Sequence, residues 1–133
     1  MRKNEVVFLT LSEVAEIHAD QIERFGGDAG IRDMGLLSSA VAMPHATFQQ
    51  VFLHSDIFEM AAAYAFHICQ NHPFIDGNKR TAIASALVFL ELNGVELADP
   101  GGKLYQAMIS LASGSLNKAG FASILRELRI VED

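Results

Sequence analysis

Hydrophobic residues along this 133-residue chain recur every three or four positions, with charged and polar residues between them. This spacing places apolar side chains on one face of an α-helix and predicts a mainly helical protein. The first run follows Thr10-Leu11-Ser12-Glu13, the spacing of a capping box, and we expect its helix to end near Phe25, before Gly26-Gly27. Asp33 is placed to cap a second helix, which should close before Pro44.

The second half of the chain continues this pattern. Residues 57–70 follow Asp56 and are apolar on nearly every side, which is typical of a helix buried at the centre of a bundle. Residues 82–90 predict another buried helix, with Gly94 as its stop signal. Two further amphipathic runs predict helices at residues 104–112 and 121–128.

Two segments lack a clear helical period. Residues 45–55 are expected to be a loop or a short helical piece, and residues 95–97 could form a short strand that pairs with residues 6–8. We therefore expect an all-α bundle of about six to seven helices, with at most a short N-terminal or flap β-element. Half of the residues are hydrophobic, so residues 1–133 can form a single domain with its own core.

Composition excludes several classes of protein. The formal net charge is −6, whereas non-specific nucleic-acid binding depends on clustered Lys and Arg. No basic recognition helix is visible, which disfavours a helix-turn-helix DNA reader. No apolar run approaches the roughly 18 residues of a membrane span, and residues 6–9 are too short for a signal-peptide core. We therefore expect a cytoplasmic protein that binds neither nucleic acid nor membrane.

The single cysteine and four of the five histidines give no sign of a site. Cys69 lies in an apolar helical run and has no partner for an internal disulfide, which fits a reducing compartment and predicts a small core residue. A zinc site would need three or four convergent ligands, and these histidines lack the spacing for one. We expect core or surface positions for His18, His45, His54 and His67.

One segment gathers a base, a carboxylate and two cations directly before the helix predicted at 82–90: His72-Pro73-Phe74-Ile75-Asp76-Gly77-Asn78-Lys79-Arg80-Thr81. Its Gly-Asn pair lies at a helix N-terminus, where free backbone N–H groups and the positive end of the helix dipole favour an anion. Lysine and arginine add positive charge that suits phosphate oxygens. The sequence thus predicts a nucleotide-phosphate site formed by Gly77, Asn78, Lys79 and Arg80.

Three more features extend this site to catalysis. Asp76 needs a divalent ion to offset its charge beside phosphates, so we expect it to hold Mg²⁺. Histidine titrates near neutrality, so His72 is suited to take a proton from an attacking hydroxyl, with Arg80 as the third catalytic candidate. Phe74 should anchor the loop in the core. The alternative is that these residues are ordinary solvated side chains around a common Gly-Asn turn.

This segment resembles the signature loop of the Fic/Doc (Fido) superfamily. Fic enzymes have the form H-P-F-x-[DE]-G-N-G-R and Doc (death-on-curing) toxins H-x-F-x-x-A-N-K-R; Pro73 and Gly77 are as in Fic, and Lys79 is as in Doc. Residues 24–37 look like the Gly-Gly and Gly-(Ile/Met)-x-Asp region near the start of Doc-like toxins. The resemblance runs from about Leu11 to the C-terminal helices, and it implies a Fido-type helical bundle of the Doc branch.

The resemblance implies two possible reactions, both with ATP and Mg²⁺. In Doc, the lysine goes with transfer of the γ-phosphoryl group to a hydroxyl of elongation factor Tu, which blocks translation. In Fic enzymes, a small residue at that position leaves room for the β- and γ-phosphates, and AMP is transferred instead. Lys79 fills that room, so we favour a Doc-like protein kinase toxin, while Gly77 and Pro73 keep adenylyl transfer as the alternative.

A third hypothesis is a catalytically silent module that binds a nucleotide or a partner. It is disfavoured because the loop retains every residue of the expected chemistry: His72, Asp76, Asn78 and Arg80.

The resemblance also bears on regulation. Many Fic proteins carry an inhibitory [ST]-x-x-x-E-[GN] helix, but residues 12–17 and 55–60 each lack its last position. Restraint should therefore come from outside, from a Phd-like antitoxin whose disordered C-terminal segment folds into a surface groove. Arg24, Arg32 and Asp33 are candidates to line a groove for nucleotide or antitoxin, although Asp33 is equally well explained as a helix cap.

Overall fold

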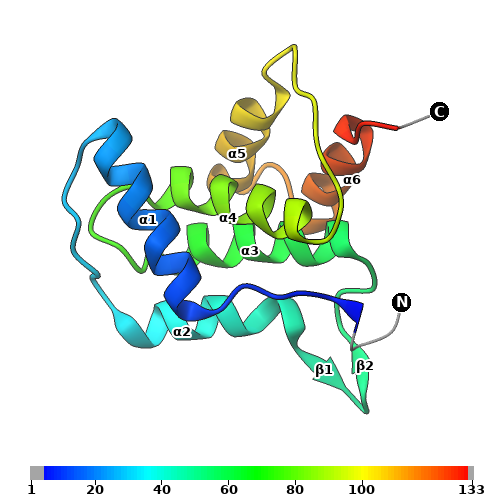
Figure 1. Cartoon of the computed structure of the whole chain (residues 1–133), viewed down its shortest axis with the longest axis horizontal. Helices are drawn as coiled ribbons and strands as arrows, with labels where there is room; N and C mark the ends of the chain where they lie inside the picture. The colour runs from blue at the N-terminus through cyan, green and yellow to red at the C-terminus, as the bar shows by residue number, and fades with distance from the viewer. Residues whose placement is uncertain (1–4, 132–133) are drawn as a thin grey trace.

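The computed structural model describes residues 5–131, which form six α-helices, a short 3-10 helix and a two-stranded hairpin (Figure 1). The α-helices are α1 (Leu11–Phe25), α2 (Met34–Ala42), α3 (Ile57–Asn71), α4 (Asn78–Leu92), α5 (Lys103–Ser113) and α6 (Lys118–Leu128). The 3-10 helix is Met43–His45, and the strands are β1 (Thr47–Phe48) and β2 (Val51–Phe52). The all-α fold class with a flap β-element is confirmed. Within these residues, no helix has both the length and the apolar composition needed to cross a membrane.

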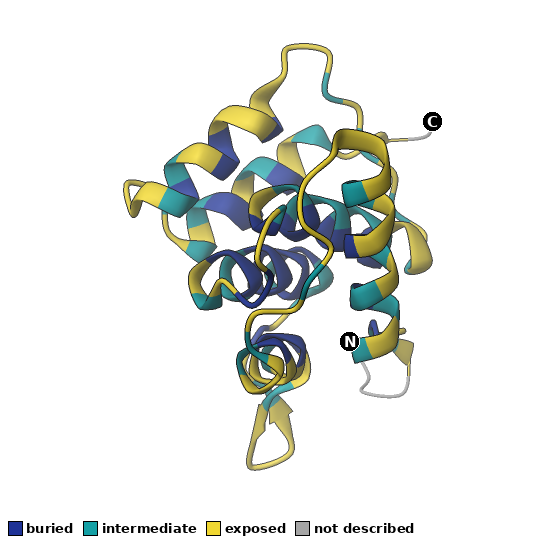
Figure 2. Cartoon of the chain, turned by 90° about the vertical axis from the view of Figure 1, so that its left-hand side faces the viewer, coloured by how far each residue is buried: buried dark blue, intermediate teal, exposed yellow. Residues whose placement is uncertain are grey.

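Helix α3 lies at the centre of the bundle and packs against α2, α4, α5 and α6 (Figure 1). It is buried along most of its length, whereas the β1–β2 hairpin projects from the body and is largely exposed (Figure 2). Small side chains on α3 let the neighbouring helices approach closely, since its fully buried residues include Ala61, Ala62, Ala63 and Ala65. The central buried helix expected at 57–70 is confirmed.

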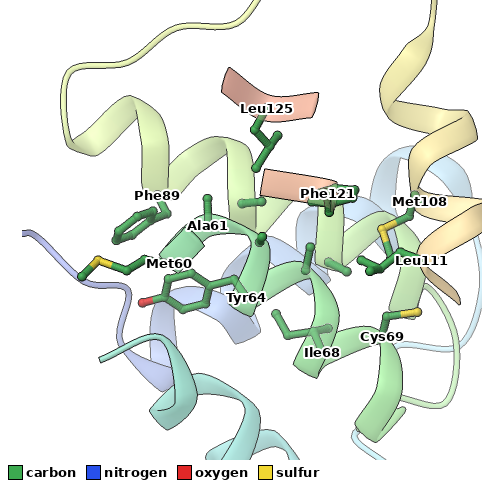
Figure 3. Close-up of a cluster of buried hydrophobic side chains, with 14 of the residues drawn as sticks. Met60, Ala61, Tyr64, Ile68, Cys69, Phe89, Met108, Leu111, Phe121 and Leu125 are labelled. Atoms are coloured by element: carbon green, nitrogen blue, oxygen red, sulfur yellow. The ribbon is translucent and has the colours of Figure 1, made fainter. Parts of the chain in front are cut away.

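Large apolar side chains from α3, α4, α5 and α6 meet in one core (Figure 3). Burying each of them contributes about 1.5–3 kcal/mol, which makes this cluster the main source of stability. Its members include Met60, Ile68, Phe89, Leu111, Phe121 and Leu125. Cys69 is buried at the edge of this core, as expected, and its burial raises the pKa of the thiol.

Local side-chain caps fix the starts of the first three helices. The Thr10 hydroxyl accepts from the Glu13 N–H at 3.1 Å, and the Glu13 carboxylate accepts from the Thr10 N–H at 2.9 Å, which is the predicted capping box. Asp33 accepts from the N–H of Leu36 at 2.9 Å to begin α2. In the same way, Asp56 begins α3 by accepting from the N–H three residues later.

The segment 45–55 is a hairpin rather than a loop or a helical piece. Strands β1 and β2 pair antiparallel through Thr47 with Phe52 and Phe48 with Val51. The turn between them places Gln49 and Gln50 at φ of 51° and 68°. Asn and Gly are the usual residues in such turns, so the sequence carried no turn signal here.

The strand predicted at 95–97 was wrong. Leu97 makes only an isolated bridge with Arg129, although the flanking backbone also joins this segment to the end of α6. The N-terminal segment has a different partner, because the N–H and carbonyl of Val7 both bond to the Asn93 side-chain amide at 2.9 Å. The side chain of Asn93 thus bonds the segment that was expected to pair with residues 95–97.

Tyr64 links the N-terminal segment to the core, and this contact can be tested. Its hydroxyl accepts from the buried Leu9 N–H at 2.8 Å. Tyr64→Phe should lower the free energy of unfolding by about 1–3 kcal/mol, because that N–H loses its partner. Tyr105→Phe is the control, since Tyr105 is 66% exposed, and it should change stability by less than about 0.5 kcal/mol. Equal urea midpoints for the two variants would contradict this assignment.

Candidate functional site

The loop between α3 and α4 begins with a strained residue. His72 is the C-terminal cap of α3 and adopts the left-handed region, with φ 52° and ψ 50°. Its N–H donates to the carbonyl of Ile68 at 3.2 Å, and Pro73 then prevents the helix from continuing. A non-glycine residue in this conformation costs energy, which the surrounding contacts must offset. The His72 side chain is left exposed at the end of α3.

Helix α4 begins at Asn78, four residues before the predicted run, so the second half of the motif forms its first turn. Gly77 supplies the left-handed turn into it, with φ 78°. The other five helices of the described chain each begin with a side-chain oxygen bonded to a first-turn N–H, from Thr10, Asp33, Asp56, Asp99 and Asn117.

Helix α4 has no such side-chain cap, so its first N–H groups remain directed into the loop. These N–H groups belong to Asn78, Lys79 and Arg80. The positive end of the helix dipole lies at the same place and adds partial positive charge. Free N–H groups at the positive end of a helix are suited to bind an anion. Lys79 is exposed beside them, and Arg80 is partly buried.

The side chain of Asn78 closes the loop on itself. Its Oδ1 accepts from the Phe74 N–H at 3.0 Å, and its Nδ2 donates to the Phe74 carbonyl at 2.9 Å. The residue is 4% exposed. We expected Asn78 to hold phosphates, but the structure commits its side chain to the loop and leaves only its main-chain N–H for a ligand.

Phe74 is fully buried and lies against a histidine that sequence reasoning missed. The His18 ring stacks on it with centroids 3.7 Å apart and planes 5° apart. His18 Nε2 lies 2.8 Å from the main-chain carbonyl of Asp76, and because a carbonyl only accepts, this nitrogen carries the donated proton. A signal was present, because Val14 and His18 are four residues apart and both lie on the buried face of α1.

The linker between α1 and α2 holds the loop from the other side. The N–H groups of Arg32 and Asp33 both donate to the Pro73 carbonyl, at 2.7 and 3.0 Å, and the Ile75 N–H donates to the Gly30 carbonyl at 3.0 Å. The Arg32 guanidinium also donates to the carbonyls of His72 and the preceding residue, at 2.7 and 3.0 Å. A cation therefore satisfies the C-terminus of α3, where the helix dipole is negative.

The same linker orients two of the charged residues of the site, Asp76 and Arg80. Asp76 Oδ2 accepts from the Asp28 N–H at 2.8 Å, and Arg80 Nη2 donates to the Gly26 carbonyl at 3.0 Å. The Arg80 guanidinium lies 5.3 Å from the ring centre of Phe25, and its buried Nε has no partner among the described residues. Both side chains are thus held in place yet keep atoms for a ligand.

A magnesium ion fits the donor set of this loop only with a substrate present. Asp76 is exposed and offers a hard carboxylate oxygen. Among the described residues, no cluster of three His, Cys, Asp or Glu side chains could hold a metal by itself. Mg²⁺ commonly binds through one or two carboxylates together with substrate phosphates and water, which matches a single aspartate beside the α4 N-terminus.

The three residues that we expected to line a groove have separate structural contacts. Arg24 forms an exposed ion pair with Asp20 at 3.0 Å, Arg32 binds the α3 carbonyls and Asp33 caps α2. For Asp33, the helix-cap alternative therefore describes the structure. Nothing in these contacts joins the three into one groove.

Comparisons with known proteins relate the chain to one family. Residues 8–90 match the Fic/DOC family. The chain is 33% identical over 118 residues to "Protein kinase doc" of Escherichia phage P1, which covers 87% of this chain and 90% of that protein. It is 49% identical over 74 residues to "Toxin Doc" of Mycolicibacterium smegmatis, which covers 56% of this chain and 57% of that protein.

The support that His18 gives the loop can be separated into its two parts. His18→Phe keeps a ring on Phe74 but removes the donor to Asp76, and it should lower the free energy of unfolding by about 1 kcal/mol. His18→Ala also removes the stacked ring, leaves a cavity and should cost about 2–5 kcal/mol. Urea denaturation measures both, and hydrogen exchange of the Asn78 N–H reports on the loop itself. Equal losses in the two variants would show that stacking contributes nothing.

Proposed function

Since this chain belongs to the Fic/DOC family, we propose that it is a Doc-like toxin of a toxin–antitoxin pair, which transfers the γ-phosphoryl group of ATP to a protein hydroxyl. One observation carries the proposal. In the described chain, α4 is the helix whose first-turn N–H groups make no bond to a side-chain oxygen, and this open N-terminus lies within a loop that presents His72, Asp76 and Lys79 to solvent. The two relatives named Doc support the toxin branch.

The residues of the loop divide the reaction between them. His72 accepts the proton of the target hydroxyl while the hydroxyl oxygen forms its bond to the γ-phosphorus. The bond from the γ-phosphorus to the β–γ bridging oxygen breaks, and ADP leaves with that electron pair. Arg80 and the α4 N–H groups offset the negative charge of the phosphates. Asp76 would hold Mg²⁺, which would supply further neutralisation of the phosphate charge.

The order of the nucleotide phosphates depends on Lys79. This side chain is exposed on the first turn of α4, beside the N–H groups that would hold phosphate. Its ammonium occupies space that the resemblance assigns to the β- and γ-phosphates in AMP-transferring relatives. We therefore favour phosphoryl transfer. Pro73 and Gly77, which match the Fic pattern, make adenylyl transfer the second candidate.

The target we propose is elongation factor Tu, which would place the protein in the cytoplasm and make inhibited translation the cause of toxicity. The purified chain, incubated with Mg²⁺-ATP and elongation factor Tu, should add a phosphoryl-sized mass to the target. His72→Ala and Asp76→Ala should each abolish this gain, because one lacks the base and the other the metal ligand. Intact-mass spectrometry measures all three reactions, and Asp99→Ala, at the start of α5, is a matched control that should keep activity.

The other outcomes discriminate between the hypotheses. An AMP-sized gain would establish the adenylyl reaction instead. If elongation factor Tu stays unmodified while a protein in a whole lysate gains a phosphoryl group, the chemistry holds and the target is wrong. A lack of any gain in the lysate, together with growth arrest that His72→Ala retains, would contradict catalysis and favour a binding module.

For the antitoxin, we propose a groove between α1 and α4. A cavity of about 320 Å³ lies there, with an acidic rim that includes Glu16 and Asp20 and an apolar floor formed by Ile17, Ala84 and Val88. This combination suits an amphipathic helix with basic residues beside its apolar face. A disordered C-terminal segment of a Phd-like antitoxin could supply such a helix by folding on binding. Arg24 lies next to this rim, paired with Asp20.

This location predicts a variant that escapes neutralisation. Ala84→Arg should block the groove and weaken antitoxin binding by about tenfold, or about 1.4 kcal/mol, without affecting toxicity when no antitoxin is present. Leu92→Arg is the control, since it adds the same charge at an exposed position of α4 outside this groove. Growth on co-expression of a Phd-like antitoxin reports the difference. Equal rescue of both variants would place the antitoxin elsewhere.

A further inference from the structure

A second cluster of titratable groups lies away from the loop, where α3, α6 and the segment after β2 meet. Lys118, in the first turn of α6, places its Nζ 3.3 Å from His54 Nε2 and 3.1 Å from His67 Nε2. His54 is 8% exposed, and its buried Nδ1 has no hydrogen-bond partner among the described residues. The chemistry proposed for the loop does not use these groups.

The hydrogen-bond geometry fixes the charges of this cluster. An ammonium only donates, so the Nε2 atoms of His54 and His67 both accept and both rings are neutral. Burial and the charge of Lys118 lower the pKa of His54, and the charge of Glu59 raises it to a smaller extent. Burial, with the same ammonium and the neighbouring ring, lowers the pKa of His67 to about 4. At neutral pH the cluster therefore carries one positive charge.

That charge has no acidic partner. In the described part of the chain, Lys118 makes no ion pair, and besides the two rings it only lies 5.3 Å from the ring centre of Phe66. Burial lowers the pKa of its ammonium. Glu59 lines the same cavity, but its Oε2 accepts from the Ser55 hydroxyl at 2.6 Å and lies 3.6 Å from Arg126. Lys118 therefore has no carboxylate as an ion-pair partner, although the chain as a whole has a net charge of −6.

The cluster borders a cavity large enough for a small ligand. Its volume is about 510 Å³, which is within the range of roughly 300–1,000 Å³ that ligand sites occupy. Met43, Leu53 and Phe66 provide apolar walls. Lys118 and Ala119 begin α6, and their N–H groups have no partner within the helix, whereas the next N–H, of Gly120, is bonded by the Asn117 side chain. One wall is therefore cationic and rich in donors, Glu59 lies on another and is already bonded to Ser55, and the remaining lining is mainly apolar.

We propose that this cavity binds a carboxylate carried on an apolar group. The carboxylate accepts from Lys118 Nζ and from the N–H groups of Lys118 and Ala119, where the helix dipole favours an anion. The apolar group packs against Met43, Leu53 and Phe66. A free organic acid and an acidic side chain of a bound protein share this chemistry. The proposal does not depend on phosphoryl transfer.

The test uses the purified chain and 3-phenylpropionate as the probe. Imidazole signals of His54 and His67, followed by NMR, should shift with the acid until they saturate, and the uncharged 3-phenylpropionamide should leave them unchanged. Lys118→Met should weaken binding of the acid by about tenfold or more. Lys103→Met is the matched control, because Lys103 is an exposed lysine of α5 that pairs with Glu127.

A second variant keeps the test decisive if Lys118→Met fails to fold. Leu53 is 57% exposed, so Leu53→Asp should leave the fold intact while its added carboxylate repels the acid. Equal shifts with the acid and the amide, or unchanged binding in both variants, would overturn the proposal.

A blocked Phe-Asp dipeptide distinguishes the two sources of the carboxylate. If the dipeptide binds the cavity about tenfold more tightly than the free acid, the natural ligand is a protein segment. The reverse order indicates a small organic acid. Absence of saturable binding by either probe would show that the site does not exist.

Discussion

The burial of Phe74 is the contact on which the loop depends. Its ring is stacked by His18, its backbone N–H and carbonyl are both closed by the Asn78 amide, and it bridges Ile31 in the α1–α2 linker. One residue thus joins α1, the linker and α4 to the end of α3. With this point fixed, the left-handed conformation of His72 can be sustained, because the neighbouring bonds hold the chain on both sides.

Around Phe74, the polar side chains that hold the loop together are different from those that the loop exposes. Buried polar groups close the loop and satisfy backbone atoms, and the polar ends that remain exposed belong to His72, Asp76 and Lys79. The N-terminus of α4 differs from those of the other helices, in which a side-chain oxygen bonds the first turn and stabilises it by about 1 kcal/mol. Leaving one helix uncapped costs some stability, and it leaves N–H groups free, as the phosphate site that we propose requires. Lys118 is likewise left without an ion-pair partner, and it lines a cavity.

Much of the fold and the outline of the site could be predicted because the signals are local. The caps at Thr10, Asp33 and Asp56 each act on a backbone N–H three residues later, so the sequence shows both partners. The candidate segment, residues 72–81, is contiguous, and a loop followed by a helix needs no distant partner to expose its N–H groups. The exception among local features was the hairpin, whose turn at Gln49 and Gln50 lacks the usual residues.

The sequence by itself determined the six helices and the chemistry of the loop between α3 and α4, because helical periodicity, caps and a contiguous motif depend on neighbours in the chain. Only the tertiary structure decided which distant groups meet. His18, for which the sequence left a core or a surface position open, supports the loop through Phe74 and Asp76. Arg32 binds the carbonyls at the end of α3, and the Asn78 side chain binds the loop backbone. The tertiary structure also replaced the expected strand pairing of 95–97. Each of these contacts joins residues at least four positions apart. Tertiary packing decides which of them meet, and the hydrophobic pattern of the chain does not specify these pairs.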